Sequence, residues 1–151
     1  MELTNGEIAI RLAAAALAGG GLGLNRELKH KPAGLRTLAL VGLGAAIAII
    51  ATAELSGGDP DAMSRTSQGI LTGIGFLGAG VIMQRDEAQA VTGLTTAASI
   101  WVTAGLGLAC GLGHWRLGMF GMLFALGILV LGGAVEGFLH RWVSGTTKPN
   151  Y

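Results

Sequence analysis

Five long apolar runs constrain the fold of this chain more than any other feature. They occupy about residues 8–24, 38–53, 67–83, 93–113 and 117–139. Each run is near the ~20 residues with which an α-helix crosses the hydrocarbon core of a bilayer, and the second and third are at the short end. All three prolines, Pro32, Pro60 and Pro149, lie between or outside the runs, so none interrupts a helix. The runs therefore predict an all-α bundle of five transmembrane helices.

The composition supports a membrane protein with one domain. Hydrophobic residues make up 51% of the 151 residues and charged residues only 13%, which is about half the usual quarter for a soluble protein. A soluble chain of this length would have too little polar surface to cover five such helices. We expect a membrane domain over residues 1–143 and a short tail over residues 144–151. The net charge of +1 comes with no extended basic face, so we expect no nucleic acid partner.

Lysine and arginine are distributed unevenly between the two ends of the predicted helices. One side holds three of them, namely Arg11, Arg65 and Arg116. The other side holds the remaining seven, which are Arg26, Lys29, Lys31, Arg36, Arg85, Arg141 and Lys148. Because basic residues concentrate in cytoplasmic loops, this bias predicts a cytoplasmic C-terminus and an N-terminus outside.

The third run is unusually rich in glycine and reads GILTGIGFLGAG over residues 69–80. In a membrane, such small residues let neighbouring helices approach closely. We therefore expect a central helix with neighbours on more than one side, and we expect Gly73→Leu to disrupt the bundle. Two further GxxxG pairs occur, at residues 19 and 23 and at residues 107 and 111. The predicted packing glycines of the third run are Gly69, Gly73, Gly75, Gly78 and Gly80.

Two groups of polar residues stand out from the apolar background. The first is a predicted charge cluster on the cytoplasmic side, formed by Arg26, Glu27 and Arg36, in which Glu27 offsets one arginine. The second is a predicted polar helix interface. Its hydroxyls could bond neighbouring helices or their own i−4 carbonyls, or they could line a path for an ion or water. The residues of this interface are Gln68, Thr72, Thr95, Thr96 and Ser99.

Other polar positions give weaker signals. Glu7 and Arg11 are spaced i, i+4 and predict an interfacial ion pair, although Arg11 could instead reach into an external vestibule. Asp59 is a candidate external cation contact, and the alternative is a solvated turn at Asp59-Pro60. The histidines show no metal-ligand spacing, and the chain contains no nucleophile motif or phosphate-binding loop. The sequence therefore predicts neither enzymatic chemistry nor a cofactor.

Several segments resemble the MgtC/SapB family of inner-membrane proteins. They are GIGFLGAGVI at residues 73–82, GLTTAASIWVTAGLGLACG at residues 93–111, the first connection with Arg26, Glu27 and KPAGLRT at residues 31–37, and Asp59-Pro60. The resemblance covers residues 17–113, with its three long blocks in the family's order. It implies a membrane domain of about five helices in the bacterial inner membrane.

The resemblance also implies departures and a broad function. Fuller members carry a soluble C-terminal domain, and we expect this chain to be a short member without it. They usually have a Glu where this chain has Asn25, and often a His where it has Leu38, so a proton- or metal-linked role of that pair would be lost here. Family members are associated with magnesium-limited growth, with survival of intracellular bacteria and with membrane potential, and they resemble regulators of other membrane proteins.

Three functions are consistent with these features. The glycine faces favour a non-enzymatic regulator that binds another membrane protein, helix against helix. The same faces could build a homo-oligomer. The polar residues within the spans favour a small channel or transporter for Mg²⁺, K⁺ or H⁺. Cation sites usually use a ring of acidic groups inside the membrane, and the absence of such a ring here ranks the channel second.

Overall fold

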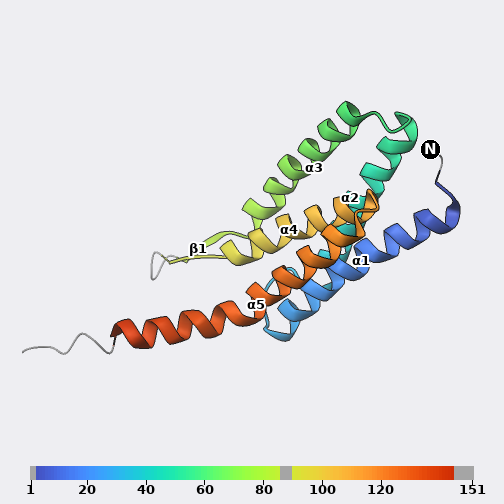
Figure 1. The fold of residues 1–151 in the computed structure, drawn as a ribbon. Helices are drawn as coiled ribbons and strands as arrows, with labels where there is room; N and C mark the ends of the chain where they lie inside the picture. Colours follow the sequence, from blue (N-terminus) through green and yellow to red (C-terminus); the bar gives the residue numbers. More distant parts are fainter. Residues whose placement is uncertain (1–2, 86–89, 145–151) are drawn as a thin grey trace, which may run out of the picture.

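The computed structural model describes residues 3–85 and 90–144 and confirms an all-α bundle of five helices (Figure 1). Of the predicted tail over residues 144–151, residue 144 ends the last helix and residues 145–151 lie outside the described part. The helices are α1 Asn5–Leu28, α2 Leu35–Leu55, α3 Pro60–Gly80, α4 Leu94–Gly111 and α5 Trp115–Ser144.

Local caps explain where two of the helices begin. The hydroxyl of Thr4 accepts the backbone N–H of Glu7, and the Glu7 carboxylate accepts the backbone N–H of Thr4, which forms a capping box at the start of α1. Asp59 caps α3, and Pro60 occupies its first turn, where a missing N–H costs nothing. As a result, α3 begins at Pro60, well before residue 67, where the apolar run predicted its start.

A short hairpin joins α3 to α4, where the sequence suggested only a connection. Strand β1 (Met83–Arg85) pairs antiparallel with β2 (Ala90–Thr92), and Met83 lies opposite Thr92. Gly93 then precedes α4 with a φ of 93°, a left-handed conformation that favours glycine. A Cβ at this position would also collide with the carbonyl oxygen of Val81. The hairpin and this glycine set the direction in which α4 enters the bundle.

The centre of the bundle is α4, and the expectation that α3 is central is wrong for the single chain. Eleven of the 18 residues of α4 are buried, because α1, α2, α3 and α5 all pack against it. In contrast, Gly78 is the one buried residue of α3 among those described. Figure 1 shows α3 at the edge of the bundle, with α4 between it and α5. The glycine content of α3 is therefore not explained by burial within this chain.

Close packing through glycine instead occurs among α1, α2 and α4. A Cβ at Gly19 would collide with the Leu38 backbone of α2, and one at Gly23 would collide with the backbone at the start of α2. On the other side of α2, a Cβ at Gly107 would collide with the Gly42 backbone, and Gly111 lies against Ala46 and Ile49. The two GxxxG pairs of α1 and α4 thus bring both helices close to α2. The sequence correctly indicated them as packing motifs.

Four of the described helices are long and apolar enough to cross a membrane, namely α1, α2, α4 and residues 115–133 of α5. The exception is α3, because its first half carries Asp61, Ser64, Arg65 and Gln68. It nevertheless has the same length as α2, which is 21 residues, and it runs along the bundle beside α2 and α4. Its composition is thus more polar than that of the helices around it.

Candidate functional site

A buried arginine cross-links the helices at one end of the bundle. Arg26 lies in the last turn of α1, and its side chain is only 4% exposed. Its Nε donates to the Pro32 carbonyl at 3.1 Å, and its Nη1 donates to the Ser99 hydroxyl at 3.3 Å. Its Nη2 donates to the hydroxyl of Thr96. One guanidinium, whose planar group presents several donors in a fixed geometry, therefore joins α1, the α1–α2 connection and α4.

The hydroxyls of α4 are bonded within the bundle. Ser99 Oγ donates to the carbonyl of Thr95 at 2.7 Å while it accepts from Arg26. One turn later, Thr103 Oγ1 donates to the carbonyl of Ser99 at 2.7 Å. Thr96, Ser99 and Thr103 are all buried. These hydroxyls therefore bond to α1 and to their own i−4 carbonyls, as the first of the two alternatives from the sequence requires.

The charge of this polar core disfavours the passage of cations. Among the described contacts of Arg26, the acceptors are the neutral oxygens of Pro32, Ser99 and Thr96. These hydrogen bonds offset part of the cost of burying the charge of the guanidinium. A fixed positive charge among bonded hydroxyls repels cations electrostatically. The arrangement is suited to fixing the positions of α1 and α4.

The predicted cluster of Arg26, Glu27 and Arg36 does not form. Arg26 turns into the bundle, whereas Glu27 turns toward α2, where its Oε2 accepts the backbone N–H of Leu35 at 3.0 Å. This carboxylate supplies the cap that Gly34, the N-cap residue of α2, cannot provide with a side chain. Arg36 is exposed in the first turn of α2. Adjacent residues of a helix point in different directions, which separates Arg26 from Glu27.

The predicted polar interface is also divided. Thr96 and Ser99 are buried against α1, whereas Thr95 is exposed on α4. Gln68 and Thr72 are exposed on α3, and neither side chain has a hydrogen-bond partner among the described residues. The two α3 residues therefore belong to a different surface from the buried hydroxyls of α4.

That surface is a continuous stripe on α3, which we call the outer face. Its members are spaced i, i+4, i+7 and i+11, so they share one side of the helix. All of them are polar or small, and all are exposed: Gln68, Thr72, Gly75 and Ala79. The buried group of Arg26, Thr96 and Ser99, which we call the Arg26 cluster, lies inside the bundle. In contrast, the outer face is exposed and can meet another molecule.

The glycines of α3 differ from those of the other helices in their surroundings. A Cβ added at Gly78 would lie 3.6 Å from the Ala97 side chain, which is ordinary contact. At the other four predicted packing glycines, an added Cβ would have no heavy atom within 4 Å. They line no helix contact within the single chain, so their predicted packing role requires a second molecule. These four are Gly69, Gly73, Gly75 and Gly80.

Arg11 has a structural role that the sequence did not reveal. The predicted ion pair with Glu7 is absent, because the Glu7 carboxylate turns back to Thr4. Arg11 instead donates from Nη1 to the Gly111 carbonyl at 2.8 Å, across 100 residues of sequence. It thereby supplies a cation and a donor at the C-terminus of α4, where carbonyls lack helical partners. Only the three-dimensional approach of α1 to α4 creates this pair.

Asp59 acts as a helix cap in this structure. Its Oδ2 accepts the backbone N–H of Ala62 at 3.0 Å, which satisfies one of the free donors at the start of α3. Over the described residues, no three side chains from His, Cys, Asp and Glu come together in a group that could hold a metal ion. The solvated-turn alternative accounts for this position without a cation.

Comparison with known proteins identifies the family. The sequence model of the MgtC family matches residues 12–138. Protein SrpB of Synechococcus elongatus is 43% identical over 129 residues, which are 79% of this chain and 71% of SrpB. The Escherichia coli K12 protein named "Putative magnesium transporter YhiD" is 42% identical over 132 residues. Protein MgtC of Salmonella typhimurium LT2 is 47% identical over 107 residues. No solved structure matches the chain.

The aligned segment covers most of this chain but less of two relatives. It spans 82% of this chain and 59% of YhiD, and 71% of this chain and 44% of MgtC. The matched region nevertheless includes all of α2, α3 and α4 together with the Arg26 cluster and the outer face. The family match and the four apolar helices lead to one conclusion. This chain belongs to the MgtC family and is a multi-pass protein of the bacterial inner membrane.

Proposed function

We propose that this protein is a non-enzymatic regulator that binds another integral membrane protein through the outer face of α3. The observation that carries the proposal is the exposure of Gln68 and Thr72 without hydrogen-bond partners among the described residues. Polar side chains that face lipid are unfavourable, and such residues commonly bond across helix interfaces in membranes. A partner helix would satisfy both side chains.

The rest of the outer face fits the same role. Gly75 and Ala79 continue the stripe toward the end of α3, and nothing in the chain lies within 4 Å of a Cβ at Gly75. Small residues allow two helix backbones to approach closely, which increases van der Waals contact where the hydrophobic effect gives no driving force. A helix with its own small residues would fit against this stripe.

The physiological setting that we propose is magnesium homeostasis. It rests on family membership and on a relative whose name describes a magnesium transporter. We further propose that the end of the bundle with Arg26 and Arg36 faces the cytoplasm, because basic residues concentrate there. In this arrangement the protein alters the activity of a membrane protein, or the membrane potential, through contact between helices.

Affinity capture of the full chain from native bacterial membranes tests the proposal. We expect another integral membrane protein to be recovered with the wild type and lost with Gly75→Leu, which adds bulk to the outer face. Gly105→Leu is the matched control, because a Cβ at Gly105 also has no atom within 4 Å but lies on α4. Recovery of only the protein's own copies would favour the homo-oligomer instead.

Ion conduction is the second candidate, and the exposed polar residues of α3 are the observation that favours it. Several copies could place Gln68 and Thr72 around a common pore. Flux of Mg²⁺, K⁺ or H⁺ into liposomes containing the purified protein tests this function. Flux above that of empty liposomes, reduced by Gln68→Leu, would favour the channel over the regulator.

A further inference from the structure

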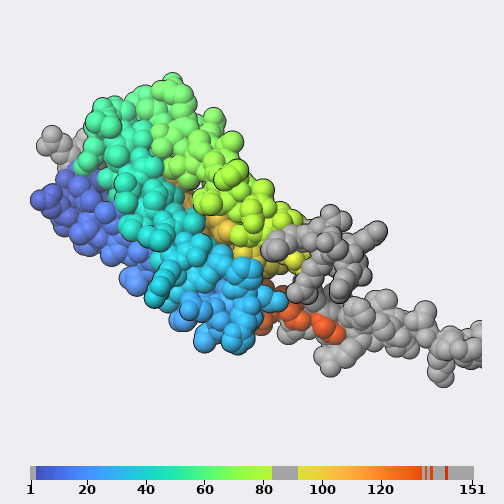
Figure 2. Space-filling view, turned by 180° about the vertical axis from the view of Figure 1, so that it is seen from behind, coloured from blue at the N-terminus to red at the C-terminus, as the bar shows by residue number. Residues whose placement is uncertain are grey.

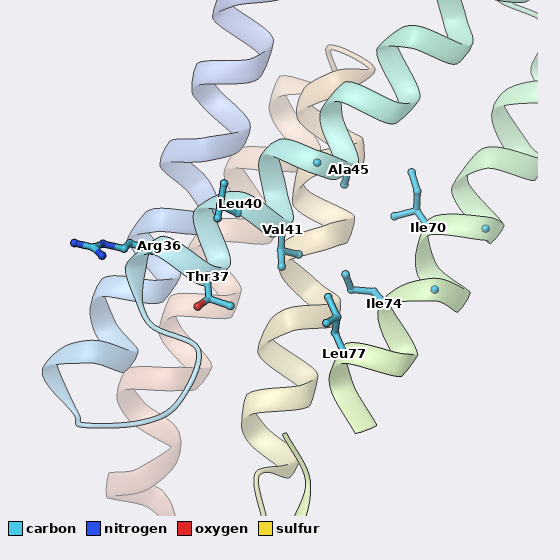
Figure 3. Close-up of a pocket in the computed structure, with 11 residues that line it drawn as sticks. Arg36, Thr37, Leu40, Val41, Ala45, Ile70, Ile74 and Leu77 are labelled. Carbon is cyan, nitrogen blue, oxygen red and sulfur yellow. The ribbon is translucent and has the colours of Figure 1, made fainter. Parts of the chain in front are cut away.

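A groove separates α2 from α3. Its volume is about 600 Å³, within the ~300–1,000 Å³ of small-molecule sites. Figure 2 shows it as a hollow between the cyan surface of α2 and the green surface of α3, with the yellow atoms of α4 at its floor. In Figure 3, Val41 from α2 and Ile74 and Leu77 from α3 project into the gap.

The length of the groove matches one leaflet of a bilayer. Along α2 its lining extends from Arg36 to Ala45, which is about 14 Å at 1.5 Å per residue. Half of a hydrocarbon core of about 30 Å is about 15 Å. A partner helix that crosses the membrane would need a groove about twice as long, whereas an acyl chain needs only this length.

A contact between the two helices lies beyond the end of the groove that is farther from Arg36. The hydroxyl of Thr52 on α2 lies 3.0 Å from the hydroxyl of Thr66 on α3. The distance between α2 and α3 therefore closes toward their connecting loop and widens toward Arg36 and Leu77, as Figure 1 also shows. A ligand can enter from the wide end or from the side, but it cannot continue between the helices across the whole membrane.

Polar and basic groups lie only at the wide end. Arg36 and Thr37 are both exposed in the first two turns of α2, and Lys31 is exposed in the preceding connection. In Figure 3 the guanidinium of Arg36 points away from α3, at the level of the end of α2. That position is outside the apolar part of the groove, and a basic residue at the end of a membrane span reaches the lipid headgroups. A ligand with an apolar chain and an anionic head is complementary to both parts.

We propose that an anionic phospholipid binds in this groove, with an acyl chain between α2 and α3 and its phosphate near Arg36. The acyl chain of the lipid contacts Val41, Ile70, Ile74 and Leu77. The headgroup is attracted by Arg36 and by the basic α1–α2 connection, as anionic lipids are attracted by basic residues next to a membrane span. The site is independent of the proposed partner contact, since the outer face lies on another side of α3.

Native mass spectrometry of the delipidated full chain in detergent tests the proposal. The added probes are dioleoylphosphatidylglycerol and, separately, dioleoylphosphatidylcholine. We expect the wild type to bind phosphatidylglycerol more tightly. Arg36→Gln should reduce this preference about fivefold, the factor expected for one basic residue near an anionic headgroup.

Variants that fill the groove give the second part of the test. Gly44→Leu and Gly73→Leu both add a side chain to the lining, at positions where a Cβ has no heavy atom within 4 Å, so the fold is preserved. We expect both to lose binding of either lipid at least tenfold, and Gly105→Leu on α4 to retain it. Thermal unfolding verifies that each variant is folded.

Three results would overturn the proposal. Equal binding of the two lipids by the wild type would exclude headgroup recognition, and full lipid binding by both groove-filling variants would place the lipid elsewhere. A dimer mass that Gly44→Leu abolishes would show that a second copy occupies the groove. Since capture of a partner depends on Gly75 and lipid binding on Gly44, the failure of one proposal is distinguishable from the failure of the other.

Discussion

The Nη1 atom of Arg26 lies 3.3 Å from the Ser99 hydroxyl, and this contact joins the last turn of α1 to α4 across 73 residues of sequence. The guanidinium is buried and also bonds to the Pro32 carbonyl. It therefore holds three separate segments in one arrangement. The mutual position of α1 and α4, the helix against which all others pack, depends on this side chain.

Replacement of Arg26 should destabilise the bundle strongly. Arg26→Gln removes most of the donors and leaves Thr96 and the Pro32 carbonyl without their partner, at a cost of about 2–3 kcal/mol in the free energy of unfolding, as for a charge-assisted hydrogen-bond group. Arg26→Lys should restore little, since an ammonium cannot reproduce the planar fork. Thermal unfolding in detergent measures the effect, with the exposed Arg65→Gln as control. An unchanged midpoint for Arg26→Gln would contradict the cross-link.

Removal of the Ser99 hydroxyl should cost more stability than removal of the Thr103 hydroxyl, although both hydroxyls bond to i−4 carbonyls. Ser99→Ala also removes the acceptor of Arg26, and an unsatisfied buried donor costs about 1–3 kcal/mol. Thr103→Val removes only the bond to the Ser99 carbonyl, which already has a helical partner, so we expect less than about 0.5 kcal/mol. Equilibrium unfolding of both variants under the same conditions gives the comparison. Equal losses would show that the contact with Arg26 adds nothing.

Substitution by leucine should destabilise the bundle at Gly107 but not at Gly73. At Gly107 the new side chain would collide with the α2 backbone at Gly42, and overpacking of this kind costs about 1–3 kcal/mol or more. Gly73→Leu should leave the unfolding midpoint of the monomer unchanged, because nothing lies near an added Cβ. This reverses the expectation from sequence that Gly73→Leu disrupts the bundle. A lower midpoint for Gly73→Leu than for Gly107→Leu would contradict the observed place of α3.

Arg11 should protect the end of α4. Without its donation to the Gly111 carbonyl, the last turn loses a charge-assisted bond and a favourable interaction with the helix dipole, together about 1 kcal/mol. Hydrogen exchange of the backbone amides of residues 107–112 should accelerate about fivefold in Arg11→Gln, while the first half of α4 remains protected. Uniform acceleration along α4 would indicate global destabilisation instead of a local cap.

The helices and two of their packing motifs could be predicted from the sequence because they follow from local patterns. Apolar runs of sufficient length located the helices, and the pairs at Gly19–Gly23 and at Gly107–Gly111 indicated where helix backbones approach one another. The start of α3 was missed, because Asp59 and Pro60 begin the helix in a polar segment that lies outside any apolar run.

The arrangement of the polar residues could not be derived in the same way. Glu27 follows Arg26 directly, yet Glu27 caps α2 while Arg26 enters the bundle. Which helix each side chain meets depends on the positions of neighbours that no local pattern encodes. The glycines of α3 have the same sequence signature as those of α4, but they lie at the edge of the chain. A GxxxG motif indicates that a close contact is possible, and it does not tell which molecule makes it.

Photocrosslinking from position 68 in native membranes tests the central claim most directly. A photoreactive amino acid replaces Gln68 on the outer face of α3, and a control carries it at Phe120, an exposed position on α5. We predict an adduct with a different integral membrane protein from position 68 and only lipid adducts from position 120. Lipid adducts alone from position 68, or adducts only with a second copy of this chain, would contradict the account.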